Sequence, residues 1–266
     1  MITTSRRAEV RKICEAERAA GTRVGFVPTM GALHDGHRSL IHRARAENAF
    51  VVVSIFVNPA QFGPHEDLDA YPRTLDEDLR ICDAEGVDLV FHPDADEIYP
   101  EPSHTTIHVG GLTDTMEGAH RPGHFDGVCL VCTKLFDIVG PCTAYFGQKD
   151  AQQLCVIRQL VRDLDLPVDI VGCETIRDAD GLALSSRNAH LSPEERARAL
   201  ALPRALRAIA DGAPVDEARD LLHEVEVDYL EMVDPDTLEP TTRGPALVCG
   251  AVRVGKTRLI DNVTVR

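Results

Sequence analysis

The sequence predicts an α/β fold in which a parallel sheet is followed by a smaller α+β domain. Two observations lead to this prediction. Up to about residue 175, apolar runs of strand length alternate with amphipathic helical segments, which is the pattern of a parallel sheet. Beyond that point the chain contains alanine-rich helices and then strands that look antiparallel. We therefore expect one domain over residues 1–175 and a small C-terminal domain over residues 176–266.

The expected elements of the first part alternate along the chain. An amphipathic helix is expected over residues 5–20, with Thr3, Thr4 and Ser5 as candidate N-caps. The run 50–57 is almost continuously apolar, which is typical of a parallel strand buried on both faces. The other expected strands are 24–28, 87–91, 143–146 and 168–171, and the other helices begin at His37 or cover 74–85, 128–139 and 151–164.

The second part opens with a helix signal. Ser192-Pro-Glu-Glu195 has the residues of a capping box and predicts a helix that runs to about Ala210. Strands are expected over 227–233, 246–254 and 258–260. Residues 250–257 also fit the P-loop pattern G-x-x-x-x-G-K-T, but the residues that follow favour a strand, whereas a P-loop requires a helix. We therefore expect a hairpin at Gly255-Lys256.

Composition excludes several classes of function. The chain has 266 residues, 44% of them hydrophobic, and a formal net charge of −15. This negative charge argues against a general nucleic-acid or membrane-surface binder, because both depend on a basic face. The eight cysteines form no small-scaffold framework, and neither a signal peptide nor an apolar run of transmembrane length is present. We expect reduced thiols, a cytoplasmic location, and no nucleic-acid or membrane partner.

One loop organises the prediction of function. An apolar strand leads into Met30-Gly-Ala-Leu-His-Asp-Gly-His37, and apolar residues at helical spacing follow. The loop therefore opens on a helix N-terminus, where free N–H groups and the helix dipole attract phosphate. Gly31 and Gly36 let a ligand approach the backbone closely, and His34 and His37 flank Gly36. We interpret the loop as a nucleotide-phosphate site. The alternative is that the two histidines only cap or solvate a turn.

Two later segments have a similar chemical character. Gly147-Gln-Lys-Asp150 lies between an expected strand and helix, so Lys149 can offer charge to a phosphate and Asp150 can accept from ribose hydroxyls. Asp180-Gly-Leu-Ala-Leu-Ser-Ser-Arg-Asn188 supplies two hydroxyls and a guanidinium, which suit a triphosphate that loses pyrophosphate. Each segment alone could equally be a solvated turn or a capped helix end. The prediction depends on three phosphate-suited segments in one chain.

Other candidate residues have simpler interpretations. Cys129 and Cys132 form a lone C-x-x-C in an apolar helical pattern, with no second pair to complete a zinc site, so we expect core packing. Asp76, Glu77 and Asp78 stand at the start of an expected helix. Their simplest role is to compensate the helix dipole, and attraction of Mg²⁺ is a second possibility.

The motifs and their order resemble the pantothenate synthetase family. The resemblance extends from the first strand to Asp261-Asn262, which is nearly the whole chain. It rests on six motifs, which are Pro28-Thr-Met-Gly-Ala-Leu-His-Asp-Gly-His37, Ser54-Ile-Phe-Val-Asn-Pro-Ala-Gln-Phe62, Tyr71-Pro-Arg-Thr74, Arg121-Pro-Gly-His-Phe125, Phe146-Gly-Gln-Lys-Asp150 with Gln152-Gln153, and Asp180-Gly-Leu-Ala-Leu-Ser-Ser-Arg-Asn188.

The resemblance implies a Rossmann-like nucleotidyltransferase domain, related through H-x-G-H to class I aminoacyl-tRNA synthetases, with a small C-terminal lid. It implies that Gln61, Gln153 and Asn58 bind substrate, with Gln61 close to both pantoate and β-alanine. His37 is the family's assigned acid, and the family implies Mg²⁺ and a homodimer. The implied ATP-binding residues are Met30, Gly31, Ala32, Leu33, His34, Asp35, Gly36, His37, Gly147, Gln148, Lys149, Asp150, Ile176, Leu184, Ser185, Ser186 and Arg187.

The implied activity is ATP-dependent condensation of pantoate with β-alanine in the route to coenzyme A. The pantoate carboxylate attacks the α-phosphorus, pyrophosphate leaves, and β-alanine then displaces AMP from the pantoyl adenylate. The first step needs mainly alignment and charge stabilisation. His34, His37, Lys149 and Arg187 are the expected catalytic residues, and Mg²⁺ would add charge. The two glutamines suit the hydroxyls of pantoate.

Two other functions remain open at this stage. The first is another H-x-G-H nucleotidyltransferase, which would release pyrophosphate without forming AMP. The second is a catalytically silent ATP-binding homologue. The chain also departs from the usual family pattern, with Gln148 in place of Glu, Ala60 in place of Met and Cys142 in place of Asp. The phosphate-suited residues are intact, so we expect an active enzyme.

Overall fold

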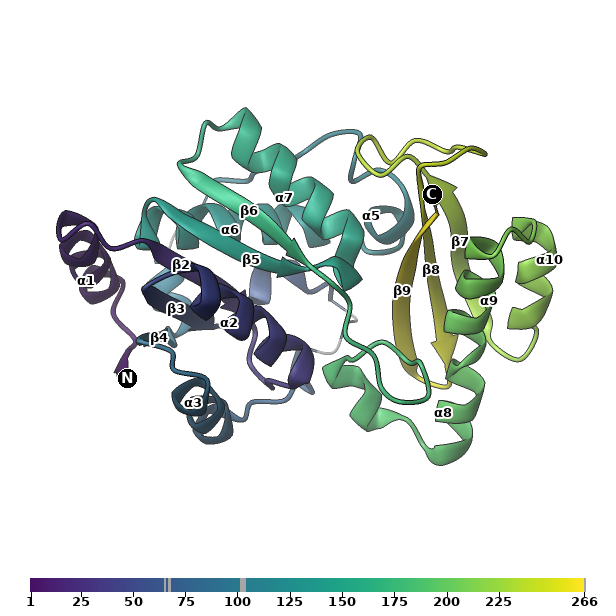
Figure 1. Cartoon of the computed structure of the whole chain (residues 1–266), viewed down its shortest axis with the longest axis horizontal. Helices are drawn as coiled ribbons and strands as arrows, with labels where there is room; N and C mark the ends of the chain where they lie inside the picture. The colour runs from purple at the N-terminus through teal and green to yellow at the C-terminus, as the bar shows by residue number, and fades with distance from the viewer. Residues whose placement is uncertain (65, 67, 101–103, 266) are drawn as a thin grey trace.

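Six parallel strands form the central sheet of the first part (Figure 1). The computed structural model describes residues 1–64, 66, 68–100 and 104–265. The strand order across the sheet is β1-β4-β3-β2-β5-β6, and every neighbouring pair is parallel. This confirms the predicted α/β class. The strands are β1 (Ile2–Thr4), β2 (Val24–Thr29), β3 (Phe50–Ile55), β4 (Leu89–Phe91), β5 (Cys142–Gly147) and β6 (Val168–Cys173).

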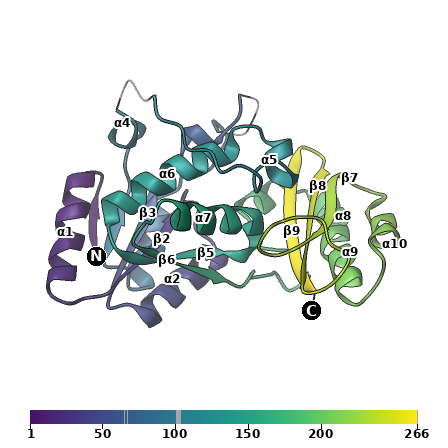
Figure 2. The ribbon, with the colours of Figure 1, turned by 90° about the horizontal axis from the view of Figure 1, so that it is seen from above.

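Helices cover both faces of this sheet, as Figure 2 shows from above. Alternate side chains of each strand point to opposite faces, so Phe26 and Val52 lie in one core cluster while Val27 and Val53 lie in the other. The first cluster is closed by α1 (Arg7–Ala19), α6 (His124–Val139) and α7 (Ala151–Asp163), and the second by α2 (Asp35–Glu47) and α3 (Leu75–Ala84).

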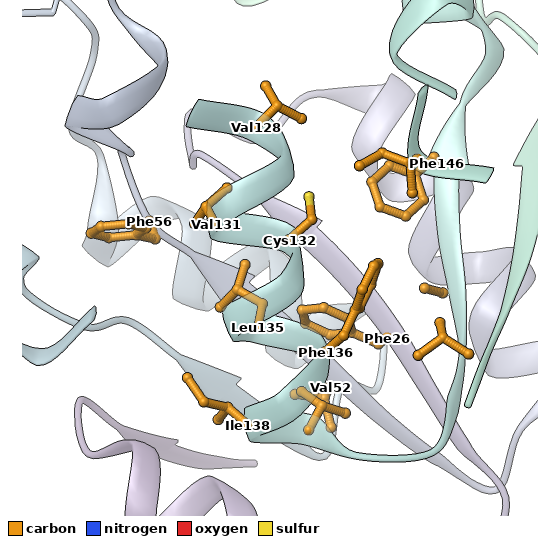
Figure 3. Close-up of a cluster of buried hydrophobic side chains, with 14 of the residues drawn as sticks. Phe26, Val52, Phe56, Val128, Val131, Cys132, Leu135, Phe136, Ile138 and Phe146 are labelled. Atoms are coloured by element: carbon orange, nitrogen blue, oxygen red, sulfur yellow. The ribbon is translucent and has the colours of Figure 1, made fainter. Parts of the chain in front are cut away.

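The apolar face of α6 forms much of the first cluster (Figure 3). Its Cys132 and Phe136 pack toward Phe26 of β2, and the rings of Phe26 and Phe136 meet edge to face at 6.3 Å between centroids. Cys129 and Cys132 are buried in this core, and burial raises the pKa of the Cys129 thiol to about 12. The interpretation of the C-x-x-C as core packing is confirmed.

The strand order creates a switch point between β2 and β5. From β2 the chain continues through β3 and β4 toward one edge of the sheet, and it then returns to place β5 and β6 on the other side of β2. The loops that leave β2 and β5 therefore diverge at their carboxyl ends. Open α/β sheets bind ligands in the crevice at this point.

The second part is a three-stranded antiparallel sheet with helices on one face. Its strands are β7 (Glu226–Val233), β8 (Ala246–Val254) and β9 (Thr257–Val265), and its helices are α8 (Pro193–Ala199), α9 (Ala201–Ala210) and α10 (Val215–Arg219). Val254 pairs with Thr257 across the turn at Gly255-Lys256, so the expected hairpin is confirmed and the P-loop is excluded. We propose that residues 1–175 and 176–266 are separate domains.

Three expected boundaries were wrong. Thr3 and Thr4 are not helix caps, because they belong to β1, which pairs with β4, and the N-cap position of α1 is Arg6. The expected helix up to Ala210 is two helices, α8 and α9, because Pro203 lacks the N–H that would continue the hydrogen-bond ladder. The capping box at Ser192 that begins α8 is confirmed.

The third wrong boundary is the start of α6, which begins at His124 and not at residue 128. Gly127 resembles a helix breaker in the sequence, but here it allows close packing: a Cβ at this position would lie 2.1 Å from the Ala60 carbonyl oxygen. Ala60 belongs to a 3₁₀ turn, η1 (Pro59–Gln61), which follows β3. The close contact therefore fixes the turn that carries Gln61 against α6.

Candidate active site

A cleft of about 250 Å³ opens at the switch point, above the carboxyl ends of β2, β3 and β5. It brings together residues from all three phosphate-suited segments of the sequence and from the turn after β3. Of the expected site residues, those that line it are Met30, His34, Gly36, His37, Asn58, Gln61, Gly147, Lys149, Asp150, Gln153, Ile176, Leu184, Ser185, Ser186 and Arg187.

His34 and His37 form a capping box at the start of α2. The His34 Nδ1 accepts from the Gly36 N–H at 3.1 Å, and the His37 Nδ1 accepts from the His34 N–H at 3.3 Å. The two rings lie 4.2 Å apart between centroids. The histidines therefore cap the helix and also line the cleft, so the two interpretations of the loop do not exclude each other.

These hydrogen bonds fix the tautomer of both rings. A backbone N–H can only donate, so each Nδ1 must be unprotonated, and the neutral ring carries its proton on Nε2. Burial is the main cause that lowers the pKa of His37 to about 3, and the neighbouring His34 adds to this effect. Burial also lowers the pKa of His34, with a further contribution from the Lys149 charge. Both histidines are thus neutral N–H donors at neutral pH, and positive charge comes from Lys149 and Arg187.

Asp78 of α3 holds the loop that precedes the histidines. It is 1% exposed, and its carboxylate accepts from the N–H groups of Ala32 at 3.0 Å and Leu33 at 2.8 Å. The loop needs this support because Gly31 and Ala32 have positive φ values of 82° and 50°. The interpretation of Asp78 as one of three dipole-compensating acids was therefore incomplete.

Lys149 and the segment that ends at Arg187 line the same cleft as the histidines. Lys149 follows β5 in the 3₁₀ turn η2 (Gln148–Asp150), and its Nζ lies 3.7 Å from the Asp150 carboxylate. Ser185 accepts from the Arg187 N–H at 3.3 Å and begins the 3₁₀ turn η3 (Ser186–His190). Two hydroxyls and two cationic side chains therefore line the cleft, and groups of these types can bind an anion.

Gln61 is held in place by Asn58 and Met30. The Asn58 Nδ2 donates to the Gln61 Oε1 at 2.9 Å, and the Gln61 Nε2 donates to the Met30 Sδ at 3.2 Å. Asn58 also donates to the Gly127 carbonyl and accepts from Ala60 and from the Tyr99 hydroxyl. These contacts use both donors and the acceptor of the Asn58 amide, so Asn58 positions Gln61. The Met30 sulfur is a weak acceptor, so the Gln61 Nε2 can exchange this contact for a hydrogen bond to a ligand.

A network of three residues that the sequence interpretation did not assign supports the same turn. The His124 Nδ1 donates to the Gln61 carbonyl at 2.9 Å, and the Arg121 Nη1 donates to the His124 Nε2 at 3.1 Å. Arg121 also forms two hydrogen bonds of 2.7 Å with Glu66. Burial, followed by the nearby Arg121 charge, lowers the pKa of His124 to about 4. In the sequence, the motif Arg121-Pro-Gly-His-Phe125 could have indicated a role for Arg121 and His124.

Five expected ATP-binding residues do not line the cleft: Gly31, Ala32, Leu33, Asp35 and Gln148. Leu33 is buried in the core, and Asp35 is exposed and lies 3.5 Å from Arg38. The Gln148 side chain lies against Gly172 of β6, so exchanging Glu for Gln at this position changes no side chain of the cleft. Ala60 is likewise exposed outside it.

The described residues contain neither a cluster of metal ligands nor a helix suited to cross a membrane. No group of three or more His, Cys, Asp or Glu side chains in that part of the chain is arranged to hold a metal ion. None of the helices described has both the length and the apolar character needed to cross a membrane.

Comparison with known proteins shows the family of this chain. A family model described as pantoate-beta-alanine ligase matches residues 2–264. A pantothenate synthetase of Koribacter versatilis is 50% identical over 97% of this chain and 94% of its own length. A pantothenate synthetase of Mycolicibacterium smegmatis is 52% identical over 97% of this chain and 85% of its own length.

Solved structures agree with this result. A pantothenate synthetase from Thermus thermophilus superposes with a TM-score of 0.93 at 49% identity, with 99% of each chain covered. A pantoate-beta-alanine ligase from Francisella tularensis, complexed with beta-gamma ATP and beta-alanine, gives a TM-score of 0.86 at 35% identity, with 99% of this chain and 97% of that chain covered.

Proposed function

The chain belongs to the pantoate–β-alanine ligase family, and we propose that its cleft uses ATP to condense pantoate with β-alanine through a pantoyl adenylate. The protein is a ligase, and its product, pantothenate, enters the route to coenzyme A. One observation supports the assignment of residues most directly. The histidine loop, Lys149, Arg187 and the two glutamines converge on one cleft at the switch point of the sheet.

In the first step, an oxygen of the pantoate carboxylate attacks the α-phosphorus of ATP, and the bond to the bridging oxygen of pyrophosphate breaks. The Nε2–H groups of His34 and His37 donate to phosphate oxygens, as their tautomers allow. Lys149 and Arg187 neutralise the charge that moves to the leaving pyrophosphate. Gln61 and Gln153 hold the hydroxyls and carboxylate of pantoate in line with the phosphorus.

In the second step, the amine of β-alanine attacks the acyl carbon, and AMP leaves with its phosphate oxygen. The tetrahedral intermediate carries negative charge close to the same Nε2–H donors. The attacking amine transfers its proton to the departing phosphate of AMP, which also accepts a hydrogen bond from His37. The family assigns His37 as the acid, and an approaching phosphate dianion would raise its low pKa toward the range where it can transfer a proton.

We further propose that Mg²⁺ enters the cleft with ATP. The described residues provide no cluster of three metal ligands, whereas Mg²⁺ binds through one or two carboxylates together with substrate phosphates and water. Asp150 and Glu174 both line the cleft and are the carboxylates we assign to this role. The ion would neutralise part of the triphosphate charge.

Two properties of the whole molecule are also proposed. A cytoplasmic location fits the eight cysteines, all of which are free. A homodimer follows from the family resemblance, and sedimentation of the purified protein at several concentrations tests it. A species with twice the mass of 29.1 kDa supports the dimer, and a monomer at every concentration contradicts it.

The decisive experiment separates the two half-reactions. Pyrophosphate release is measured with ATP, Mg²⁺ and pantoate, and AMP and pantothenate are measured after β-alanine is added. Lys149→Ala should lose both by at least about 100-fold, because a transition-state charge contact is removed. Lys12→Ala, which removes an exposed lysine on α1, serves as the matched control and should retain wild-type rates.

The same assay distinguishes the other functions. Pyrophosphate release that does not depend on pantoate would indicate a different nucleotidyltransferase. ATP binding without turnover would indicate a silent homologue. Pantoate-dependent pyrophosphate followed by β-alanine-dependent AMP, both lost in Lys149→Ala and retained in Lys12→Ala, supports the adenylate-forming ligase.

A further inference from the structure

Asn262, on the last strand of the small domain, binds the backbone of the turn that carries Lys149. The Asn262 Nδ2 donates to the carbonyl oxygens of Gln148 at 2.9 Å and Lys149 at 2.8 Å. Both partners can only accept, so the NH₂ group of the amide must face them, and both of its hydrogens are used. Asn262 is 9% exposed, which strengthens these bonds relative to a surface contact.

The preceding residue, Asp261, binds a second segment of the chain through Arg177. Asp261 is 3% exposed and accepts two hydrogen bonds from the Arg177 guanidinium, at 2.6 and 2.8 Å. Arg177 also donates to the Asn262 carbonyl at 3.2 Å. Through an antiparallel bridge to Ala183, Arg177 fixes the segment that continues into Ser185 and Arg187. Two consecutive residues of β9 therefore hold two segments that enter the cleft from different parts of the chain.

We propose that Asn262 is a positioning residue for adenylylation, which together with Asp261 sets the Lys149 turn against the segment 184–187. Asn262 does not line the cleft itself, so it acts through these backbone contacts. The inference rests on the proposed function, in which Lys149 and Arg187 act on the same triphosphate. Displacing a catalytic group by about 1 Å can cost roughly 100-fold in rate, so the contact matters for rate as well as for stability.

A purely structural role would have a different signature. If Asn262 only joined the two domains, its loss would lower the melting temperature and reduce the amount of active enzyme, and every step would fall in proportion. A positioning residue instead changes the step in which the triphosphate charge is redistributed. The second step, in which pyrophosphate has already left, should change much less. The two half-reactions therefore distinguish these roles.

The first test compares Asn262→Ala with Asn48→Ala. Asn48 is a matched control because it is 5% exposed and its Nδ2 also makes two hydrogen bonds, to the Ala44 carbonyl at 2.9 Å and the Tyr145 hydroxyl at 2.6 Å. It lies at the far end of α2, about 20 Å from the histidine loop by helix rise. ATP affinity, pantoate-dependent pyrophosphate release, and pantothenate formation from supplied pantoyl adenylate are measured below both melting temperatures.

Asn262→Ala should reduce pyrophosphate release at least about 10-fold and raise the KM for ATP, while pantothenate formation from pantoyl adenylate stays within about threefold of wild type. Asn48→Ala should lower the melting temperature with rates within twofold. Equal losses in both half-reactions, or wild-type adenylylation by Asn262→Ala, would overturn the proposal. Wild-type enzyme without pantoate-dependent pyrophosphate would instead refute the proposed function.

Asn262→Asp provides a second test that preserves the side-chain volume. Its carboxylate would face the two carbonyl oxygens that now accept hydrogen bonds, so the turn must move away from β9. We expect a larger loss of adenylylation than in Asn262→Ala, again with the aminolysis step spared. A folded Asn262→Asp protein with wild-type adenylylation would contradict the proposal even if Asn262→Ala fails to fold.

Discussion

Asp78 shows how one buried carboxylate can determine the shape of a binding loop. Its two backbone acceptor contacts hold Ala32 and Leu33, and a Cβ on Gly31 would come within 2.9 Å of its Oδ2. The loop, the glycine and the carboxylate therefore form one unit. The loop conformation that opens toward the cleft depends on a side chain 45 residues further along the chain from Leu33.

We predict that Asp78→Asn raises the KM for ATP about 10-fold and destabilises the protein by about 1–3 kcal/mol. The amide retains an acceptor for one N–H but presents a donor to the other, which leaves a buried group unsatisfied. Thermal unfolding and ATP titration measure the two effects. Asp76→Asn is the control, since Asp76 is in the first turn of the same helix but exposed, and a similar loss in both variants would show that helix charge is responsible.

Buried neutral histidines predict how stability depends on pH. The pKa of His124 is lowered to about 4 and that of His37 to about 3, both primarily by burial. The unfolded chain therefore binds more protons than the folded one between about pH 6.5 and these values, so stability is complete above pH 6.5 and falls as the pH decreases. At pH 4, the lowered pKa of His124 alone reduces the free energy of unfolding by about 3 kcal/mol relative to neutral pH.

We predict that His124→Gln flattens this part of the stability curve. Denaturant unfolding between pH 4 and pH 7 measures the slope for wild type and variant. His223→Gln, which replaces an exposed histidine, should leave the slope unchanged. If the curves of wild type and His124→Gln are parallel, then His124 does not remain neutral in the folded protein.

Helix ends show where local sequence determines an element. The Ser192 hydroxyl accepts from the Glu195 N–H at 3.2 Å, and the Glu195 carboxylate accepts from the Ser192 N–H at 2.9 Å. We predict that Ser192→Ala lowers the free energy of unfolding by about 1 kcal/mol. Ser5→Ala is the control, because its hydroxyl makes no hydrogen bond within the described part of the chain. Equal effects on thermal unfolding would argue against the capping contribution.

Elements whose signal is local in the sequence could be predicted, and elements that depend on distant contacts could not. Apolar periodicity and caps are local, so the buried strands and the start of α8 were predicted close to their true positions. β1 has three residues at a sheet edge, and its strand character comes only from pairing with β4, which is distant in sequence. The start of α6 was placed too late because Gly127 lies in its first turn. The reason for a glycine there is its close contact with the Ala60 backbone, which only the tertiary structure shows.

At the scale of the whole molecule, residues that line the cleft were predicted where they belong to a motif, and residues that support the cleft through distant contacts were missed. The motifs indicated His34, Lys149 and Gln61, which line one cleft. From the sequence, Asp78 was assigned only a helix-dipole or Mg²⁺ role and Asn262 was assigned no role, because both residues act on backbone groups 45 or more positions away. Residues that bind a ligand share a local chemical pattern, whereas residues that position the backbone do not.

An ionic network links Glu117 of the first part of the chain to the small antiparallel sheet. Arg258 of β9 donates to Glu117 of α5 (Met116–His120) at 2.7 Å and to Asp228 of β7 at 2.6 Å, and all three side chains are largely buried. Burial raises the pKa of Glu117, but Arg258 outweighs this effect and holds that pKa below its usual value. Removing the arginine would leave the buried Glu117 without its ion-pair partner and would leave Asp228 with only the weaker contact to Arg253.

We predict that Arg258→Met lowers the free energy of unfolding by about 3–5 kcal/mol at pH 7. Arg253→Met should cost less than about 1 kcal/mol, because Arg253 contacts the same Asp228 from a side chain that is 43% exposed.

In wild type, the stabilisation from the lowered carboxylate pKa values is present above about pH 4.5 and is lost below it. In Arg258→Met, protonation relieves the unpaired charges. Unfolding curves should therefore converge as the pH falls below 4.5, and a difference that is constant with pH would show that lost packing, rather than charge, accounts for the effect.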